Sequence, residues 1–180
     1  MFARSLIASA VAVAAATSPL TAQSRSESLA PATVRPFAVR MTTDDAPNVA
    51  KIRAMLEKAE ESLVAGRGAE ARKLYRAVID EQRTAGLYAG ESLWRLATAY
   101  FYSDETANVA GTLDELASEA ARFGDPSMEL RATFESAIVN QKLHRVGAVA
   151  PKLARVQTLM QSPAISDALK AEITSRIAND

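Results

Sequence analysis

The chain contains no cysteine and a single histidine among its 180 residues. Without cysteine it cannot form a disulfide, a thiolate zinc site or a cysteine nucleophile, and one histidine excludes a two-histidine metal site. Its 21 basic residues are matched by 21 acidic ones, so it lacks the basic excess that nucleic-acid binding requires. These absences exclude the common thiol and zinc enzymes and argue against nucleic acid as a main ligand.

Motifs for catalysis are also missing. The sequence has no glycine-rich phosphate loop and no dinucleotide fingerprint. The adjacent carboxylates Glu60-Glu61 and Asp114-Glu115 would point about 100° apart on a helix, so neither pair can share a substrate as acid and base. His144 stands between basic neighbours in a predicted turn, and no serine with an acidic orienting partner is suggested nearby. We therefore expect no catalytic residue, no metal and no cofactor, and a protein that is not an enzyme.

Residues 1–22 have the pattern of a secretory signal peptide. Arg4 precedes the apolar run Leu6–Ala16, which is followed by a break at Pro19. The run has eleven residues, whereas a bilayer span needs roughly 20, so we expect cleavage after Ala22 or one residue later, and no membrane span in the mature chain. The alternative, a buried N-terminal helix, would lack a polar face. The pattern predicts a periplasmic or secreted bacterial protein.

Residues 23–45 are predicted to form a flexible linker. Serines and the prolines Pro31 and Pro36 interrupt the segment, and no helical or strand period is sustained. One apolar stretch, Val34–Met41, contains Phe37. The alternative to a linker is that this stretch lies as an extended strip on the domain that follows.

Residues 46–180 are predicted to form an all-α domain. Apolar residues recur there at spacings of three and four, the period of an amphipathic helix, and no segment alternates like a strand. Short turns between the stripes favour antiparallel hairpins. The seven stripes cover residues 49–63, 71–79, 93–101, 109–123, 130–138, 146–160 and 165–177. We therefore expect about seven helices.

The chemistry of the junctions predicts where several helices begin and end. Gly124 suits the left-handed residue that ends a helix, Asp125 suits the cap of the next one, and Pro126 suits its first turn. Ser162-Pro163 repeats the cap and proline, which predicts the start of the last helix there.

Glycine and proline also indicate the turn after the first helix and the start of the sixth. Gly66 and Gly68 should close a tight turn after the first helix. Pro151 falls inside the sixth stripe, where it would break or kink a helix. Of the two possibilities, we favour a helix that starts near Ala148 over a kinked one.

The first two hairpins contain a recognisable spacing. The first carries a small residue, glycine, alanine and tyrosine in the order small-x6-Gly-x4-Ala-x3-Tyr, at Ala59, Gly66, Ala71 and Tyr75, and the second carries Leu96-Ala97-x2-Tyr100. This spacing resembles the tetratricopeptide-type helical repeat (TPR) over residues 49–123. The resemblance implies hairpins stacked as a short right-handed α-solenoid, which holds another chain in a concave groove.

The resemblance also implies which side chains face that groove. They are Arg53, Glu60 and Val64 on the first helix and Trp94, Thr98, Phe101 and Tyr102 on the third. Five of the ten aromatic residues fall between positions 88 and 102, and the alternative is that they are core packing. One narrow helical stripe cannot bury Trp94, Tyr100, Phe101 and Tyr102 together, so we expect at least one to be exposed.

Charge is uneven along the chain although its sum is zero. Residues 104–129 hold seven acids and one arginine, a net charge of −6, and residues 142–155 hold four bases and no acid, a net charge of +4. These stretches are either solvated outer faces with modest mutual attraction or a surface for a partner or for head-to-tail self-association.

Together these features predict an exported TPR-like adaptor or scaffold that binds another protein or peptide of the cell envelope. Two alternatives remain open. One is a structural envelope subunit that forms a homo-oligomer through its charged helices. The other is a helical accessory domain that assists an enzyme supplied by another chain.

Overall fold

The computed structural model describes residues 46–179, which form helices and no strand. The prediction of an all-α domain is therefore confirmed for this part of the chain. The predicted signal peptide and linker lie outside the described residues. The seven helices are α2 (Ala46–Val64), α3 (Gly68–Thr84), α4 (Gly90–Phe101), α5 (Thr106–Phe123), α6 (Pro126–Lys142), α7 (Val146–Met160) and α8 (Asp167–Asn179).

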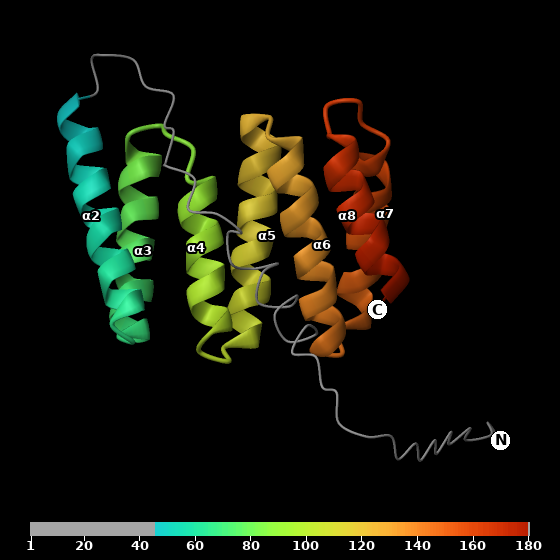
Figure 1. Cartoon of the computed structure of the whole chain (residues 1–180), viewed down its shortest axis with the longest axis horizontal. Coiled ribbons are helices and arrows are strands. Elements are labelled where there is room, and N and C mark those ends of the chain that lie inside the picture. Colours follow the sequence, from blue (N-terminus) through green and yellow to red (C-terminus); the bar gives the residue numbers. More distant parts are fainter. Residues whose placement is uncertain (1–45, 180) are drawn as a thin grey trace, which may run out of the picture.

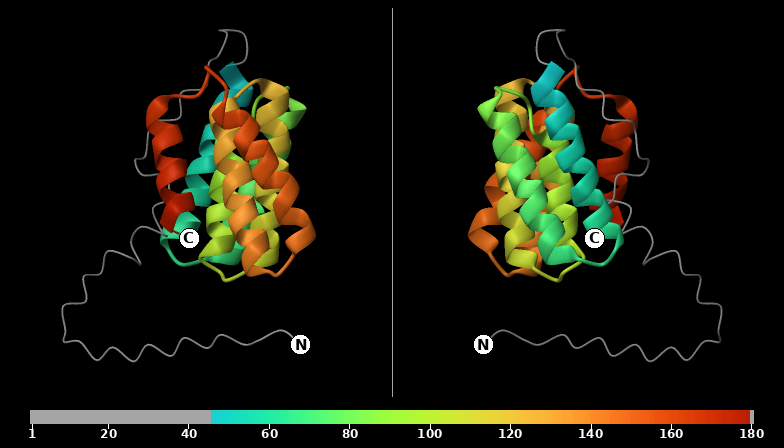
Figure 2. Two further views of the ribbon diagram at one scale, coloured as in Figure 1. Left: turned by 90° about the vertical axis from the view of Figure 1, so that its right-hand side faces the viewer. Right: turned by 90° about the vertical axis from the view of Figure 1, so that its left-hand side faces the viewer.

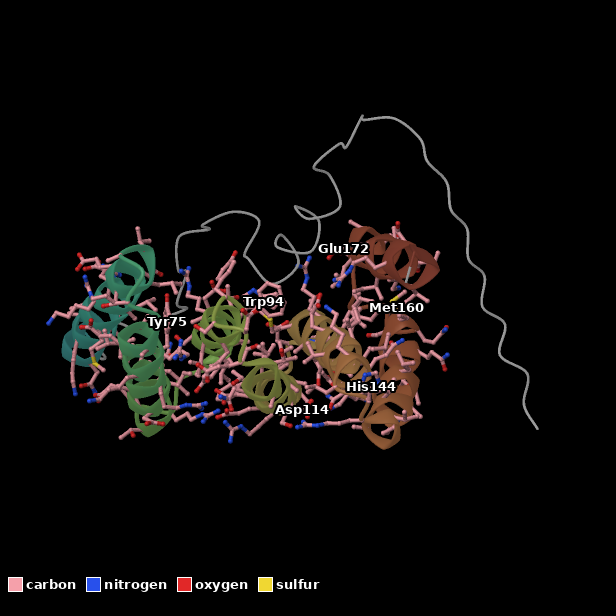
Figure 3. All side chains as sticks on the ribbon, turned by 90° about the horizontal axis from the view of Figure 1, so that it is seen from below. Tyr75, Trp94, Asp114, His144, Met160 and Glu172 are labelled. Atoms are coloured by element: carbon pink, nitrogen blue, oxygen red, sulfur yellow. The ribbon has the colours of Figure 1, made fainter. Side chains whose placement is uncertain are left out.

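Consecutive helices run antiparallel and lie side by side in a row (Figure 1). The principal contacts from α2 to α7 all join helices that follow one another in the chain. The row has two layers, with α2, α4 and α6 on one side and α3, α5 and α7 on the other, and α8 returns to the side of α2 (Figures 2 and 3). Alternate helices therefore point the same way, and the C-terminal ends of α2, α4 and α6 lie along the same edge of the row, the lower one in Figure 1.

Two apolar cores hold the row together. The main core joins α2 to α5 through fully buried side chains such as Tyr75, Leu96 and Leu113, and it includes Ala132 and Val139 of α6. The second core joins α6, α7 and α8 and consists of Leu130, Phe134, Val156, Leu159, Ile165, Leu169 and Ile173. Because α6 contributes to both cores, it is the element that connects α8 to the rest of the fold.

The three turns that lead from α2 to α3, α4 to α5 and α6 to α7 share one geometry. Each contains a left-handed residue, Gly66 at φ 74°, Asp104 at φ 57° and His144 at φ 56°. In each, the next backbone N–H donates to the carbonyl five residues earlier, from Arg67 to Ser62 (2.8 Å), Glu105 to Tyr100 (3.1 Å) and Arg145 to Asn140 (2.9 Å). The predicted turn is confirmed at Gly66, whereas Gly68 is the first residue of α3, and the other two turns repeat the geometry without glycine.

Glycine should therefore be the better residue at the two turns that lack it. We expect His144→Gly to raise the free energy of unfolding by about 0.5–1 kcal/mol, because glycine reaches positive φ without the clash of a Cβ atom. Asp104→Gly should gain less, since aspartate tolerates this conformation better. Urea unfolding followed by circular dichroism measures both changes.

The matched control reverses the exchange at the first turn. Gly66→Ala should lower the free energy of unfolding by about 1 kcal/mol through backbone strain alone, because nothing lies within 4 Å of a Cβ atom built there. A destabilised His144→Gly variant would show that the imidazole contributes more than the strain costs.

The junction between α5 and α6 is as predicted. Gly124 is left-handed at φ 70°, the Asp125 carboxylate accepts the backbone N–H of Met128 at 3.0 Å, and Pro126 is the first residue of α6. The three residues satisfy the free backbone groups of one helix end and of the next helix start.

The predicted start of the last helix at Ser162-Pro163 is wrong. The Ser162 hydroxyl accepts the N–H of Ala164 inside a turn, and α8 begins only at Asp167. Its cap is Ser166, whose hydroxyl accepts the N–H of Leu169 at 3.3 Å. The extra turn places Ile165, which is 2% exposed, in the second core.

The expected late start of α7 is also displaced. The helix begins at Val146, two residues before the predicted start, so Pro151 lies in its second turn. Proline has no N–H to donate to the carbonyl of Gly147. Gly147 and Pro151 are both exposed, so water can bond that carbonyl. Within residues 46–179, no helix is long and apolar enough to cross a membrane.

Candidate functional site

Side chains at helical spacing on α2, α4 and α6 form one surface, which we call the even-helix face. Positions i, i+4, i+7 and i+11 of a helix lie on the same side. The members are Arg53, Glu57, Glu60 and Val64 on α2, Glu91, Arg95, Thr98 and Tyr102 at α4, and Arg131, Glu135, Ile138 and Lys142 on α6.

Ion pairs across the even-helix face show that its helices share one side. Arg95 of α4 pairs with Glu60 of α2 and, at 3.1 Å, with Glu91 of its own helix. Arg131 of α6 pairs with Glu172 of α8 at 3.0 Å. These charges are therefore already used within the chain.

Arg176 provides the second link from α8 to the even-helix face. Its guanidinium pairs with Glu135 of α6 and lies 4.8 Å from the centre of the Phe134 ring. Glu135 is largely buried, so the ion pair and the cation–π contact fix α8 over this part of α6.

The end of the even-helix face at the C-termini of α2 and α4 is apolar. Val64 is 89% exposed and Tyr102 is 57% exposed. The Phe101 ring makes an edge contact with Tyr102, with 5.8 Å between the ring centres. The expectation of one exposed aromatic residue is confirmed at Tyr102. We call Val64, Phe101 and Tyr102 the apolar end.

The seven residues predicted for a groove divide into exposed and covered members. Arg53, Val64 and Tyr102 are exposed, Glu60 and Phe101 are half-buried, and Trp94 and Thr98 are each 5% exposed. Trp94 belongs to the main core and Phe101 packs against it, which agrees with the core interpretation of these two rings. Trp94 (labelled in Figure 3) therefore offers a partner little surface.

The residues that α6 and α8 bring to this surface were not predicted. Arg131, Glu135 and Ile138 have the same spacing as Glu91, Arg95 and Thr98, so the helical periodicity of α6 already indicated which of its residues share this surface. The third hairpin lacks the small-glycine-alanine-tyrosine spacing of the first. The resemblance to the repeat therefore does not extend to α6, and it does not predict which residues of α6 belong to the even-helix face.

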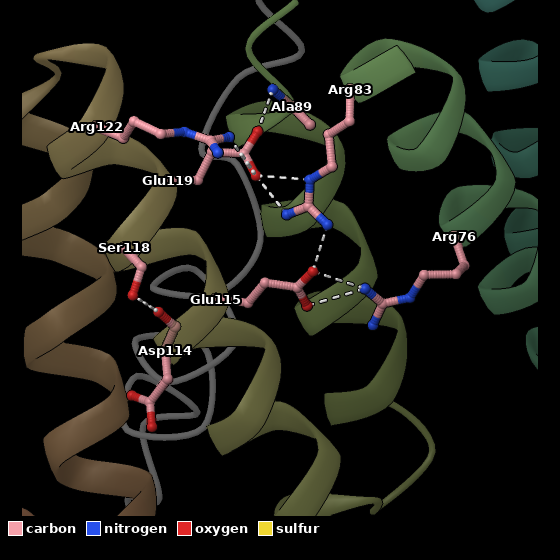
Figure 4. Close-up of polar contacts among 8 residues, drawn as sticks. All are labelled: Arg76, Arg83, Ala89, Asp114, Glu115, Ser118, Glu119 and Arg122. Atoms are coloured by element: carbon pink, nitrogen blue, oxygen red, sulfur yellow. Dashed lines mark hydrogen bonds and ion pairs between the residues drawn. The ribbon is translucent and has the colours of Figure 1, made fainter. Parts of the chain in front are cut away.

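The acidic side of α5 faces arginines of α3 (Figure 4). Glu115 accepts hydrogen bonds from Arg76 at 2.9 and 3.0 Å and from Arg83 at 2.7 Å. Glu119 is buried and accepts from Arg83 Nε at 2.8 Å and from the backbone N–H of Ala89 at 2.9 Å. These contacts join the end of α3, the start of α4 and the middle of α5.

The pKa of Glu115 reflects this arrangement. Burial alone would raise it, but the hydrogen bonds and charges of Arg76 and Arg83 outweigh burial and lower the pKa of the carboxyl below 4.5. A carboxylate with a lowered pKa stabilises the fold above its unfolded pKa, and this contribution is lost as the pH falls through its folded pKa.

Glu115→Gln should therefore cost stability only when the carboxylate is charged. Because Glu115 and its arginines are about one-third exposed, we expect a loss of about 1 kcal/mol at pH 7. The difference between the two proteins should begin to shrink as the pH falls below 4.5, the ordinary pKa of the group, and should vanish once the pH is below the lowered pKa of the folded state. Urea unfolding at pH 7, 4 and 2 tests this, and a difference that persists at pH 2 would contradict the charge-based account.

The acidic and basic stretches meet inside the chain. Lys152 of α7 pairs with Asp114, which also accepts from the Ser136 hydroxyl at 2.5 Å. Arg155 pairs with Glu129 at 2.6 Å. These contacts give the opposite net charges of residues 104–129 and 142–155 a function within one molecule. They leave little of either stretch for charge-driven self-association.

Neighbouring carboxylates on α5 point to different helices, as expected. Figure 4 shows Asp114 and Glu115 on opposite sides, and their partners lie on α7 and α3 respectively. Among residues 46–179, no group of three His, Asp or Glu side chains is placed to hold a metal ion. His144 is exposed in its turn.

An open depression of about 500 Å³ lies between α3 and the turn after α4. Arg72 spans it, with hydrogen bonds to Ser103 at 2.5 Å and to Glu105 at 2.7 Å and with its guanidinium 5.5 Å from the centre of the Tyr100 ring. Its arginines are thus paired within the chain, and the even-helix face is the stronger candidate for binding. No family model, curated protein or solved structure matches the chain.

Proposed function

We propose that the chain is an exported adaptor or scaffold that binds a segment of another envelope protein on the even-helix face. The observation that carries the proposal is the apolar end, where Val64 and Tyr102 are exposed on two helices that the ion pair between Glu60 and Arg95 joins. Exposed apolar side chains rimmed by polar ones are typical of protein-binding surfaces. Export rests on the signal-peptide pattern of residues 1–22.

The architecture of the proposed adaptor is a short right-handed solenoid of TPR-like hairpins. The support is the spacing of Ala59, Gly66, Ala71 and Tyr75 in the first hairpin, together with helix contacts that run from neighbour to neighbour. Stacked hairpins of this kind present their first helices on one continuous surface, which here would be the even-helix face.

The chemistry of the surface indicates what kind of segment it binds. Aromatic and aliphatic anchors dominate binding where they enter a site, whereas exposed ion pairs contribute little. Arg95, Arg131 and Glu135 have ion-pair partners within the chain. The bound segment should therefore carry an apolar or aromatic anchor, and salt should change its affinity little.

Capture of the partner from the native host tests the proposal. The tagged mature chain should retain a partner that the double variant Val64→Ser, Tyr102→Ala loses by at least tenfold, as expected for removal of two anchors worth about 1 kcal/mol or more each. Quantitative mass spectrometry measures the retained amount, and circular dichroism checks that helicity is unchanged.

Val146→Ser is the matched control, because Val146 is 76% exposed but lies at the start of α7 in the opposite layer. It should retain the partner. Equal recovery with all three proteins would contradict binding at the apolar end.

A further inference from the structure

We propose that residues 34–41 of this same chain bind the even-helix face as an intramolecular ligand. The inference rests on the proposed function, since it assigns an occupant to the same surface. The segment reads Val-Arg-Pro-Phe-Ala-Val-Arg-Met and lies outside the described residues. It combines an aromatic anchor with two positive charges and no acid.

The length of the chain before α2 permits this contact. The helix α2 has 19 residues and is therefore about 28 Å long at 1.5 Å per residue. Nine residues lead from Phe37 to Ala46 at the start of α2, and an extended chain of that length spans about 30 Å. A segment that runs back along α2 thus brings Phe37 level with Val64 and Tyr102.

The composition of the segment suits the surface that it would cover. The Phe37 ring would meet Phe101 and Tyr102, and aromatic rings favour edge-to-face and offset contacts with one another. On α2, Glu57 and Glu61 are exposed and form no ion pair with another described residue. Arg40, which lies between Phe37 and α2, supplies the opposite charge.

The tether makes such an interaction effective even when it is weak. A short linker holds a ligand at an effective concentration in the millimolar range. An external segment must then displace residues 34–41 before it reaches the apolar end. The segment would regulate the site by competing for it.

Because the chain has no cysteine, two introduced cysteines can form a disulfide only with each other or with another copy of the chain, and this gives a test of the contact. In the full mature chain, Ala38→Cys is combined with Ala65→Cys, because Ala65 is exposed next to Val64. Mild oxidation at low protein concentration should form an intramolecular disulfide at least tenfold faster than in a control that combines Ala38→Cys with Ala77→Cys. Ala77 is exposed on α3, in the opposite layer. Adding Phe37→Asp to the first pair should abolish the difference.

Each outcome of the oxidation decides the inference. Equal rates for the two pairs, or disulfide-linked dimers, which would indicate a second copy as the occupant, overturn it. If the disulfide fails to form but partner capture still depends on Val64 and Tyr102, the inference fails and the proposed function stands. If the disulfide forms but the amount of captured partner does not depend on Val64 and Tyr102, the proposed function fails instead.

Discussion

Replacing Glu119 with alanine should lower the free energy of unfolding by about 3 kcal/mol, at the lower end of the range for breaking a buried ion pair. The Glu119 side chain is 3% exposed and accepts both the Arg83 guanidinium and the Ala89 backbone N–H. Alanine leaves that N–H without its acceptor. Arg83 keeps its bond to Glu115, which limits the loss.

Urea unfolding at pH 7 measures this loss of stability, and two further variants show which part of it comes from the carboxylate. Glu119→Gln keeps an acceptor for the Ala89 N–H and should lose about half as much. Ser118→Ala is the matched control, because Ser118 is exposed and its hydroxyl donates only to the Asp114 carbonyl one turn earlier. It should change stability by less than about 0.5 kcal/mol. If Glu119→Ala were as mild as Ser118→Ala, the carboxylate would not hold the junction of α3, α4 and α5.

Phe134→Ala should lower stability by about 3–4 kcal/mol, and most of the effect should fall on α8. Phe134 is 2% exposed in the second core and supports Arg176 through its ring. That core contains seven buried residues, so the loss of its only aromatic ring removes much of what holds α8 on α6.

Hydrogen exchange monitored by mass spectrometry localises the effect. Amides of α8 should lose protection first, while those of α3 and α4 keep theirs, because elements with few partners open at lower free energy. Phe123→Ala is the matched control, since Phe123 is 42% exposed, and it should cost about 1 kcal/mol or less. Uniform loss of protection across the described helices would show that the two cores unfold as one unit.

The helices could be predicted from the sequence because each one buries a stripe at regular spacing. The start of α6 was also predictable, since Gly124, Asp125 and Pro126 have local roles that do not depend on the rest of the fold. The start of α8 was not, because Ser162-Pro163 suits a turn as well as a cap. The choice between them depends on Ile165, which must enter a core formed by α6 and α7.

The candidate site could be predicted from the sequence only where the number of aromatic residues on one helix decides which of them is exposed. Tyr102 is exposed because α4 cannot bury every aromatic residue on one stripe. The burial of Trp94 and the ion pairs of Arg95 depend on which helices are neighbours in space. The same limit applies to Lys152 and Asp114, whose attraction is visible in the charge pattern but whose pairing requires α5 and α7 to approach α6 from the same side.

The neighbour-to-neighbour packing of α2 to α7 has a consequence for how the chain acquires its structure. Contacts close in sequence require little loop closure, and helical proteins dominated by them fold in roughly microseconds to milliseconds. Each hairpin can form as soon as its two helices are available, without waiting for the C-terminus. The hairpins from α2 onward therefore fold progressively from the N-terminal end, and α8 closes the second core last.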